Sequence, residues 1–387
     1  MTCSAADQQG KRTGSGRRAV GMDRRAKIYV AGHTGMVGSA IVRRLRADGY
    51  ENLLLATRAE LDLTDQRAVR EFVSAERPRY VVDSAARVGG IQANMSQPAE
   101  FLYENLQIQS NLIWSAKDAG VETFLFLGSS CIYPRACPQP MREEYLMEGK
   151  PEPTNEAYAY AKIAGMKLCE YIHAEFGMNF ISCMPSNIYG ENDNFDPETS
   201  HVIPSLLRRI HQAKVAGHSE VVIWGTGSSR REFLYVDDLA DAVVWLLGTY
   251  THQQFLNVGA GEDISIRELA ERMCKVVGYE GKLLFDPTKP EGMPRKLLDV
   301  TRLHEAGWRH RIGLEEGLRR TYNWYLDDYA GSTADPELRD LNSPSPGEEG
   351  ILCTGEESRS CSRTFHPTEY RSSADWRPIS TANWERN

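Results

Sequence analysis

Long apolar runs are missing from this chain. None of its 387 residues falls in a stretch that approaches the roughly 20 apolar residues of a membrane-spanning helix. The N-terminal stretch MTCSAADQQGKRTGSGRRAVGMDRR also lacks the apolar centre of a secretory signal peptide. These absences argue against a membrane partner and against secretion, so we expect a cytoplasmic protein.

The chain also lacks an excess of positive charge. Its 45 Lys and Arg are outnumbered by 53 Asp and Glu, which gives a formal net charge of −8. A protein with a negative net charge has no general electrostatic attraction to nucleic acid or to an anionic membrane surface. We therefore expect no nucleic-acid partner, and an anionic small molecule would need a local basic pocket.

Cysteine motifs are absent too. Eight cysteines are scattered with no CxxC pair and no His/Cys cluster at metal-ligand spacing, at positions 3, 131, 137, 169, 183, 274, 353 and 361. This pattern indicates neither a disulfide framework nor a zinc site, and we expect no metal. In a cytosolic chain most of these thiols should be reduced and inert, so a cysteine in a plausible site gains interest.

What is present is the composition of an ordinary globular protein, with 41% hydrophobic and 25% charged residues. Residues 1–25 and 331–387 are polar and without periodicity, so we predict a disordered leader and tail. Between them, apolar strands and amphipathic helices alternate. This alternation predicts an α/β protein with a doubly wound parallel sheet.

A glycine-spaced turn separates the first strand from the first helix. The run KIYVAGHTGMVGSAIVRRL places Gly32, Gly35 and Gly38 in a GxxGxxG pattern. Glycines here permit a tight turn and let the backbone approach a pyrophosphate, while the helix N-terminus favours negative charge. The position predicts a dinucleotide site, and a tight turn without a ligand is the alternative.

The second strand, NLLLAT, ends where a dinucleotide fold selects its coenzyme. An acidic residue there would bind the ribose hydroxyls of NAD, but the chain has Thr57 and Arg58, and an arginine suits a 2′-phosphate. We predict NADP(H), with an exposed loop cation as the alternative role of Arg58. Asp62 and Leu63 follow, placed to border the adenine.

The stretch FLFLGSSCIYP, residues 124–134, combines a buried strand with a polar end. Its apolar half predicts a strand covered on both faces, and Ser129, Ser130 and Cys131 directly follow Gly128. Because ligands bind outside the carboxyl ends of parallel strands, two hydroxyls and a thiol here predict contact with a substrate. An ordinary loop is the alternative for this stretch alone.

A later helix carries a tyrosine and a lysine one turn apart. In YAYAKIAGMKLCE the side chains of Tyr158 and Lys162 share one face. A lysine ammonium near a phenol stabilises the phenolate and lowers its pKa, so Tyr158 can exchange a proton with a carbonyl or alcohol oxygen. Many solvated helices carry the same pair without such chemistry.

The remaining globular part is predicted in less detail. A strand from Asn179 ends in a PSN turn, and a polar loop then carries His201, which is either part of a shared site or a surface histidine. A later helix has Asp237 and Asp238 as candidate N-caps. Residues 282–308 are expected to be irregular, and a helix over residues 314–327 is the last predicted element.

The glycine turn, the SSC cluster, the YxxxK pair and the His201 loop together resemble the extended short-chain dehydrogenase/reductase superfamily. Within it the chain is similar to the enzymes that make GDP-L-fucose from GDP-4-keto-6-deoxy-D-mannose. The similar runs lie within residues 26–328 and are AGHTGMVGSAI, AARVGGI, FLGSSCIYP, EPTNEAYAYAKIAGMKLCE, NFDPETSHVIPSLLRR and KPEGMPRKLLDVTRL. The resemblance implies a Rossmann domain that binds NADP(H) and a smaller α/β substrate-binding domain.

The resemblance also implies two reactions in one site: epimerisation at carbon-3 and carbon-5, then NADPH-dependent reduction of the carbon-4 ketone. It places Ser129, Tyr158 and Lys162 in the reductase triad, with Cys131 and His201 as the base and acid of epimerisation. The ketone acidifies the hydrogens on both neighbouring carbons, so one base and one acid can serve both inversions. A thiolate suits this task if the thiol pKa falls below its usual value of about 8.5.

Further contacts carry over from the resemblance. Coenzyme contacts fall at Gly32, His33, Thr34, Gly35, Met36, Val37, Gly38, Arg58, Asp62, Leu63, Leu127, Gly128, Ser129, Ser130, Lys162, Pro185, Ser186, Asn187, Ile188 and His201. Substrate contacts fall at Arg209, Trp224, Arg231 and Glu291, the last where many relatives have aspartate. The NADP-binding domain is expected over residues 26–185 and 231–258, and the substrate domain over 186–230 and 259–330. The family's dimers suggest a homodimer built on two helices, one of them the Tyr158 helix.

Two other classes of protein remain as alternatives. Another nucleotide-sugar 4-epimerase, reductase or 4,6-dehydratase of the superfamily would share YxxxK. Such an enzyme would not need Cys131 paired with His201, and the 4-epimerases usually keep NAD, against which Arg58 argues. A non-catalytic NADP-binding regulatory protein would keep the fold without turnover, against which the intact Ser129, Tyr158 and Lys162 argue.

Overall fold

A parallel six-stranded sheet organises the first part of the chain. The computed structural model describes residues 21–197, 199–289 and 292–330. The strand order is β2-β1-β3-β4-β5-β9, and every neighbouring pair is parallel. The strands are β1 (Ile28–Ala31), β2 (Leu53–Leu54), β3 (Tyr80–Asp83), β4 (Thr123–Leu127), β5 (Asn179–Pro185) and β9 (Leu256–Val258).

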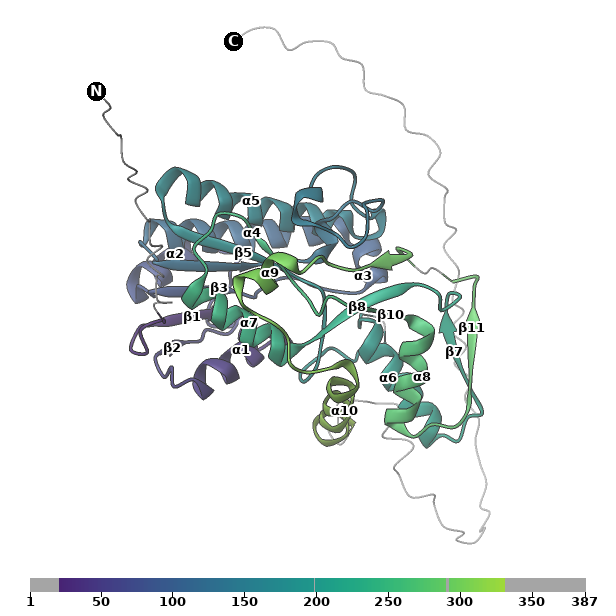
Figure 1. Ribbon diagram of the computed structural model, residues 1–387. Helices are drawn as coiled ribbons and strands as arrows, with labels where there is room; N and C mark the ends of the chain where they lie inside the picture. The colour runs from purple at the N-terminus through teal and green to yellow at the C-terminus, as the bar shows by residue number, and fades with distance from the viewer. Residues whose placement is uncertain (1–20, 198, 290–291, 331–387) are drawn as a thin grey trace, which may run out of the picture. The chain divides into compact units, whose positions relative to one another are not determined.

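Helices cover both faces of this sheet (Figure 1). Every residue of β1, β3 and β4 is buried, so each face needs a cover. One face packs against α1 (Met36–Ala47) and α7 (Val236–Thr249), and the other against α2 (Gln66–Glu76), α4 (Pro98–Asp118) and α5 (Glu156–Phe176). The predicted doubly wound Rossmann arrangement is confirmed.

The strand order reverses between β1 and β3. β2 lies on one side of β1 and β3 on the other, and the turns that follow β1 and β3 approach closely. Ser84 Oγ donates a hydrogen bond to Ala31 O at 2.6 Å. A Cβ on Gly32 would come within 2.9 Å of the Ala85 backbone. Ligands of open α/β sheets bind outside the carboxyl ends of the strands at such a reversal, so the coenzyme is expected at this edge.

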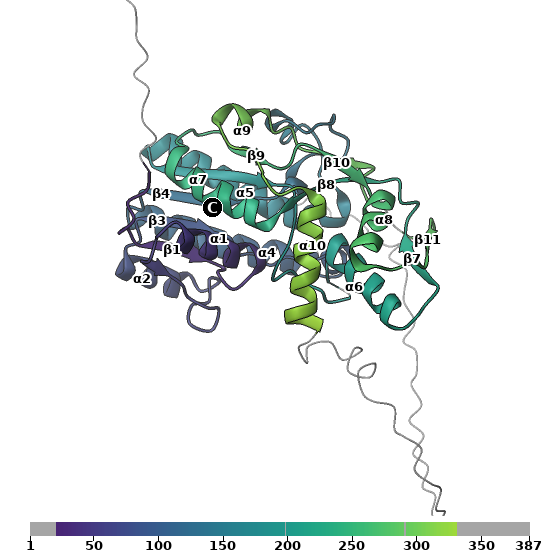
Figure 2. The same cartoon turned by 60° about the horizontal axis from the view of Figure 1, so that its bottom comes forward.

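A second group of elements contains two small sheets (Figure 2). In one, β8 (Arg230–Tyr235) pairs with β6 (Asn187–Tyr189), β10 (Asp263–Ser265) and β12 (Arg295–Lys296). In the other, β7 (Glu220–Trp224) runs parallel to β11 (Lys282–Asp286). Further helices are α3 (Ile91–Ser96), α6 (Val202–Val215), α8 (Ile266–Val277), α9 (Thr301–Ala306) and α10 (Leu314–Trp324), with a π-helical turn at Tyr325–Ala330. Single 3₁₀ turns lie at Ser130–Ile132, Glu143–Tyr145 and Pro153–Asn155.

Two local predictions are wrong in this second group. Residues 282–308 are not irregular, because they contain β11, β12 and α9; the two strands form by pairing with the distant β7 and β8. The N-cap of α7 is Tyr235 rather than Asp237 or Asp238. The Asp238 carboxylate instead accepts hydrogen bonds from the backbone N–H groups of Arg311 at 3.1 Å and Ile312 at 2.8 Å.

Packed structure begins slightly before residue 26. Met22 is buried and Asp23 forms an ion pair with Arg79 at 3.2 Å, although the predicted leader extends to residue 25. Residues 1–20 and 331–387, where the rest of the leader and the tail are predicted, lie outside the described residues. The division into two domains stays a prediction; all six strands of the large sheet fall within residues 26–185 and 231–258.

The same part of the chain has neither a membrane-spanning helix nor a metal-binding cluster. None of its helices is both long and apolar enough to cross a membrane. Over residues 21–330, apart from the three positions not described, no cluster of three metal-ligating side chains is found.

Candidate active site

The carboxyl end of β4 holds the serine and the cysteine of FLFLGSSCIYP. Gly128 continues the strand and donates its N–H to Cys183 O at 2.9 Å. A Cβ on Gly128 would overlap the sulfur of Met184, so a larger residue would fit only if the Met184 side chain moved. The chain then enters a 3₁₀ turn in which Ser129 Oγ accepts a hydrogen bond from Cys131 N at 3.3 Å. The hydroxyl and the buried thiol therefore lie together at one strand end.

Helix α5 brings Tyr158 and Lys162 to the same strand end. Lys162 Nζ donates a hydrogen bond to the carbonyl of Leu127, the last residue of β4, at 2.9 Å. Its ammonium lies 5.8 Å from the ring centroid of Tyr158 and 4.6 Å from that of Phe126. The lysine is buried and the tyrosine half-buried. The contact with Leu127 thus joins the YxxxK pair to the turn that carries Ser129.

Burial raises the pKa of Tyr158 well above its ordinary value, and the charges of Cys131 and Asp83 raise it further. The prediction that Lys162 lowers this pKa is wrong for the protein alone, because desolvation of the phenolate dominates. Burial lowers the pKa of Lys162, while Asp83 and Cys131 oppose that change. The protonated phenol is the form that donates a proton, so Tyr158 is suited to act as an acid towards a ketone oxygen.

Cys131 and His201 are both shifted towards their neutral forms. Burial raises the pKa of the Cys131 thiol, while Lys296, a hydrogen bond with Ser129 and the charge of Lys162 lower it. The condition set for the thiolate, a pKa below the usual thiol value, is therefore not met in the protein alone, since burial outweighs these groups. His201 is the N-cap residue of α6; its imidazole reaches solvent, yet the protein packed around it lowers its pKa, and the Lys296 ammonium adds to this.

Lys296 is a residue that the sequence interpretation missed. It lies on β12, in register with Arg231 on β8. Burial lowers the pKa of Lys296, and the charge of Arg231 lowers it further. The charges of Cys131 and Glu232 oppose this change. The available signal was a lysine next to the apolar pair of KLLDV, in a segment predicted to be irregular. Only the pairing of β12 with β8 places this ammonium near the thiol.

The glycine turn after β1 is shaped to approach a ligand closely. Gly32 has a φ of +76°, and a Cβ on Gly38 would overlap the carbonyl of Gly32, so both positions require glycine. Gly35 begins α1 without a side-chain cap. His33 has a buried Nδ1 with no hydrogen-bond partner among the described residues. An open helix N-terminus beside an unpaired ring nitrogen fits a phosphate-bearing coenzyme. The turn also contains Thr34, Met36 and Val37.

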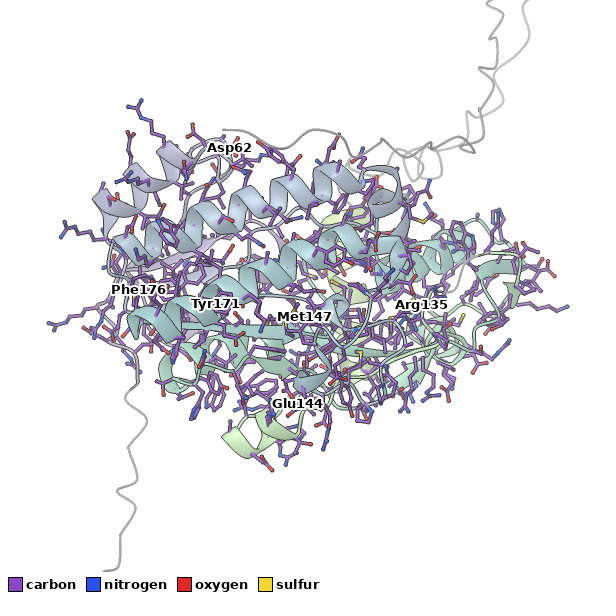
Figure 3. All side chains as sticks on the ribbon, turned by 90° about the horizontal axis from the view of Figure 1, so that it is seen from above. Asp62, Arg135, Glu144, Met147, Tyr171 and Phe176 are labelled. Atoms are coloured by element: carbon purple, nitrogen blue, oxygen red, sulfur yellow. The ribbon has the colours of Figure 1, made fainter. Side chains whose placement is uncertain are left out.

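Other strand ends hold the remaining predicted coenzyme contacts. Asp62 is exposed and is labelled in Figure 3. Hydrogen bonds from Thr64 lower the pKa of Asp62, and the charge of the exposed Arg58 adds to this effect. Ser186, after β5, is buried, and its Oγ has no partner in the described part of the chain. Asn187 Nδ2 donates to Glu232 O at 2.7 Å. The same strand ends contribute Leu63, Leu127, Gly128, Ser130, Pro185 and Ile188.

The predicted substrate contacts lie on the second group of elements. The Arg231 side chain would lie 3.3 Å from a Cβ on Gly292. Arg209 is on α6, where burial lowers its pKa. Trp224 ends β7 and is 53% exposed. Glu291 lies outside the described residues. The three described residues among these predicted contacts therefore lie on three different elements, α6, β7 and β8.

Known proteins resemble this chain over most of its length. Residues 28–259 match the model of the NAD dependent epimerase/dehydratase family. GDP-L-fucose synthase 1 of Arabidopsis thaliana is 57% identical over 304 residues, 79% of this chain and 94% of that protein. GDP-L-fucose synthase of Escherichia coli (strain K12) is 52% identical, over 78% of this chain and 97% of that protein. A solved structure, a GDP-mannoheptose C4 reductase from Campylobacter jejuni with NADP bound, has a TM-score of 0.73 and 38% identity, covering 79% of this chain and 100% of that one. The chain belongs to the NAD dependent epimerase/dehydratase family and, within it, to the GDP-L-fucose synthases.

Proposed function

We propose that this protein converts GDP-4-keto-6-deoxy-D-mannose into GDP-L-fucose. It first inverts carbon-3 and carbon-5 and then reduces the carbon-4 ketone with NADPH. The observation that carries the proposal is the meeting of the Ser129 hydroxyl, the Cys131 thiol and the Tyr158–Lys162 pair at the end of β4. The chain that holds this group is 57% identical to a GDP-L-fucose synthase.

The two inversions need a base and an acid beside the ketone. The carbonyl acidifies the hydrogens on both neighbouring carbons, because the resulting negative charge is delocalised onto its oxygen. Cys131, as the thiolate, removes the proton, and His201 returns one to the opposite face. Lys296 favours the thiolate and makes the imidazolium a stronger acid. Since burial holds the thiol pKa above its ordinary value, proton removal should become faster as pH rises.

The reduction uses the groups held by α5 and β4. When bound, NADPH supplies the hydride. Tyr158 donates a proton to the ketone oxygen, and its raised pKa keeps the phenol protonated until that step. Ser129 Oγ hydrogen-bonds the same oxygen and stabilises the charge that develops on it. Lys162, fixed by its bond to Leu127 O, places a positive charge beside the phenol.

The coenzyme is NADP(H) because of the residue after β2. The exposed Arg58 stands in this region, where an acidic residue would select NAD. Its guanidinium suits a 2′-phosphate, while Gly32, Gly35 and Gly38 let the pyrophosphate approach the N-terminus of α1. His33 and Ser186 offer buried polar atoms to the same ligand.

The protein is also proposed to be a cytoplasmic homodimer. Helices α4 and α5 lie side by side on the large sheet (Figure 3). They carry large exposed rings, each between 45% and 63% accessible, at Tyr103, Trp114, Tyr160, Tyr171 and Phe176. Exposed apolar area gathered on one face marks an association surface. The five described free cysteines suit a reducing compartment. Sedimentation should give a dimer mass, and a monomer would contradict this assembly.

The direct test of function mixes the protein with NADPH and GDP-4-keto-6-deoxymannose and follows the nicotinamide absorbance. We expect the loss of NADPH to match the formation of GDP-L-fucose. GDP-mannose, which has no ketone, is the matched control and should leave NADPH intact. No loss of absorbance with the keto sugar would overturn the proposed function.

The coenzyme assignment has its own arm in that assay. Loss of one charge-assisted contact should make Arg58→Ala raise the KM for NADPH about ten-fold, with little change for NADH. Equal use of NADH and NADPH by the unmodified enzyme would contradict the assignment.

A further inference from the structure

Asp83, the last residue of β3, is a buried carboxylate that the proposed mechanism does not use. Its exposed fraction is 0%. Its Oδ1 accepts a hydrogen bond from Ala85 N at 3.2 Å, and its Oδ2 has no hydrogen-bond partner among the described residues. Burial of a charge with an unpaired oxygen costs stability. An apolar residue would suit this end of the YVVD strand better, so the carboxylate calls for an explanation.

The carboxylate lies on the same face of the sheet as Lys162. Asp83 is in register with Phe126 of β4, and side chains in register on neighbouring strands point to one face. The Lys162 ammonium is 4.6 Å from the ring centroid of Phe126 and is held by the carbonyl of the next residue, Leu127. One sheet face therefore carries a buried anion and a buried cation as neighbours.

The two charges stabilise each other against burial. Burial raises the pKa of the Asp83 carboxyl to about 6, and the charge of Lys162 opposes this rise. Burial lowers the pKa of Lys162, and the charge of Asp83 is the first of the groups that oppose this fall. Without the carboxylate, the groups left to oppose the burial of the Lys162 ammonium are its hydrogen bond to Leu127 O and the thiols of Cys131 and Cys183, whose own pKa values are raised by burial.

The other titratable groups that feel Asp83 are held in neutral forms by burial. They are Tyr29 on β1, and Tyr158 and Cys169 on α5, and burial raises the pKa of each. Among the described residues, Lys162 is thus the cation whose charge stabilises the Asp83 carboxylate. The pair links β3 to the helix that carries the proton donor.

We propose that Asp83 is a positioning residue for the ketone reduction, whose carboxylate is the counter-charge that keeps the Lys162 ammonium charged beside Tyr158. This inference rests on the proposed function, because it assigns Lys162 to the reduction. An opposite charge nearby can change a pKa by about one unit or more. Removal of the carboxylate therefore lets burial discharge Lys162 at a lower pH, and reduction loses the upper part of its working range.

The same carboxylate lowers the stability of the fold at neutral pH. Its pKa of about 6 in the folded protein lies above its ordinary value of 3.8, so the folded state resists its ionisation. The stability that comes from the protonated form is complete below the ordinary pKa and is lost as pH rises through about 6. The charged form of Asp83 therefore destabilises the folded protein. Because this carboxylate also lies near Lys162, a functional role explains its presence better than a structural one.

The test compares the pH profile of NADPH oxidation in the wild type and in Asp83→Asn, measured in single turnovers. We expect the alkaline limb of the Asp83→Asn profile to lie about one pH unit lower. In a Lys162→Met background, Asp83→Asn should cause no further shift. Asp193→Asn is the matched control, because Asp193 is also a buried carboxylate with an unpaired Oδ2, but lies in the loop before α6; this change should leave the limb in place.

Thermal unfolding supplies a readout that does not depend on activity. The wild type should lose stability as pH rises through about 6, and Asp83→Asn should lose less over the same range. If Asp83→Asn does not fold, Asp83→Leu, of similar size, tests the same loss of charge. An unmoved alkaline limb, or an equal shift in the Lys162→Met background, overturns the inference. A wild type that oxidises no NADPH overturns the proposed function instead.

Discussion

The two groups of strands in this protein are built differently. In the large sheet, β3 and β4 are buried along their whole length between helices on both faces. In the small sheets, β6, β10 and β12 are only two or three residues long, and β7 alternates between exposed and buried residues. The large sheet supplies buried strand ends for the proposed coenzyme and reductase groups. The small sheet supplies Arg231 from β8 and Lys296 from the two-residue β12, which forms by pairing with β8.

Cys131 is where the two groups meet. It lies at the end of β4, yet the charges that lower its pKa come from Lys296 of the small sheet and Lys162 of α5. Glu232, buried in β8, fastens the small sheet by accepting hydrogen bonds from Gly261 N and Leu298 N, each at 2.8 Å. On the proposed roles, reduction therefore depends mainly on groups of the large sheet, whereas epimerisation depends on groups of both.

The largest expected effect separates the two reactions. Loss of the proton donor in Tyr158→Phe should slow ketone reduction by about 10²- to 10⁴-fold while solvent deuterium still exchanges at carbon-3 and carbon-5. NADPH oxidation reports the first process and NMR the second. Tyr160→Phe, at an exposed position of the same helix, is the matched control and should preserve both. Equal losses of exchange and reduction in Tyr158→Phe would break the separation.

A somewhat smaller effect is expected at the thiol. Cys131→Ser should slow deuterium exchange at carbon-3 and carbon-5 by about 10²-fold and affect ketone reduction less. Exchange in the wild type should also rise with pH, because burial raises the thiol pKa and the thiolate is the proposed base. Cys137→Ser, a half-buried thiol a few residues further along, is the control. Unchanged exchange in Cys131→Ser would remove this residue as the base.

The smallest effect sharpens the contribution of the small sheet. Lys296→Met removes the ammonium that favours the thiolate. The pH at which deuterium exchange increases should therefore be about one unit higher, with little change in the pH profile of reduction. An NMR exchange series over pH measures the shift. Lys282→Met, at an exposed position of β11, should leave the profile in place. A shift as large in reduction as in exchange would erase the distinction between the two groups of strands.

The same difference decides how much of the fold the sequence could predict. Continuous apolar runs such as FLFL and YVV announce strands buried on both faces, and the helices between them have clear periodicity. The strands β11 and β12 were missed because their existence depends on pairing with β7 and β8, which no local pattern records. The N-cap of α7 was predicted wrongly, since the Asp238 carboxylate accepts hydrogen bonds from backbone groups that are distant in the sequence.

The site divides in the same way. Residue types and spacing were enough to single out Ser129, Cys131, Tyr158 and Lys162, which the structure gathers at the end of β4. The directions of the pKa shifts were not predictable, because burial is a product of the whole fold. Burial is the largest cause of the shift at both Tyr158 and Cys131, and at Cys131 it outweighs the opposing charges of Lys296 and Lys162. Lys296 and Asp83 come near the site only once strands far apart in sequence have paired.

The measurement that tests the central claim most directly is the complete reaction in deuterium oxide with NADPH and the keto sugar, followed by mass spectrometry and NMR of the product. If one site epimerises and then reduces, each GDP-L-fucose should carry solvent deuterium at both carbon-3 and carbon-5, and a single NADPH should be oxidised for each product molecule. Oxidation of NADPH that yields a reduced GDP-sugar without solvent deuterium at these carbons would contradict the claim.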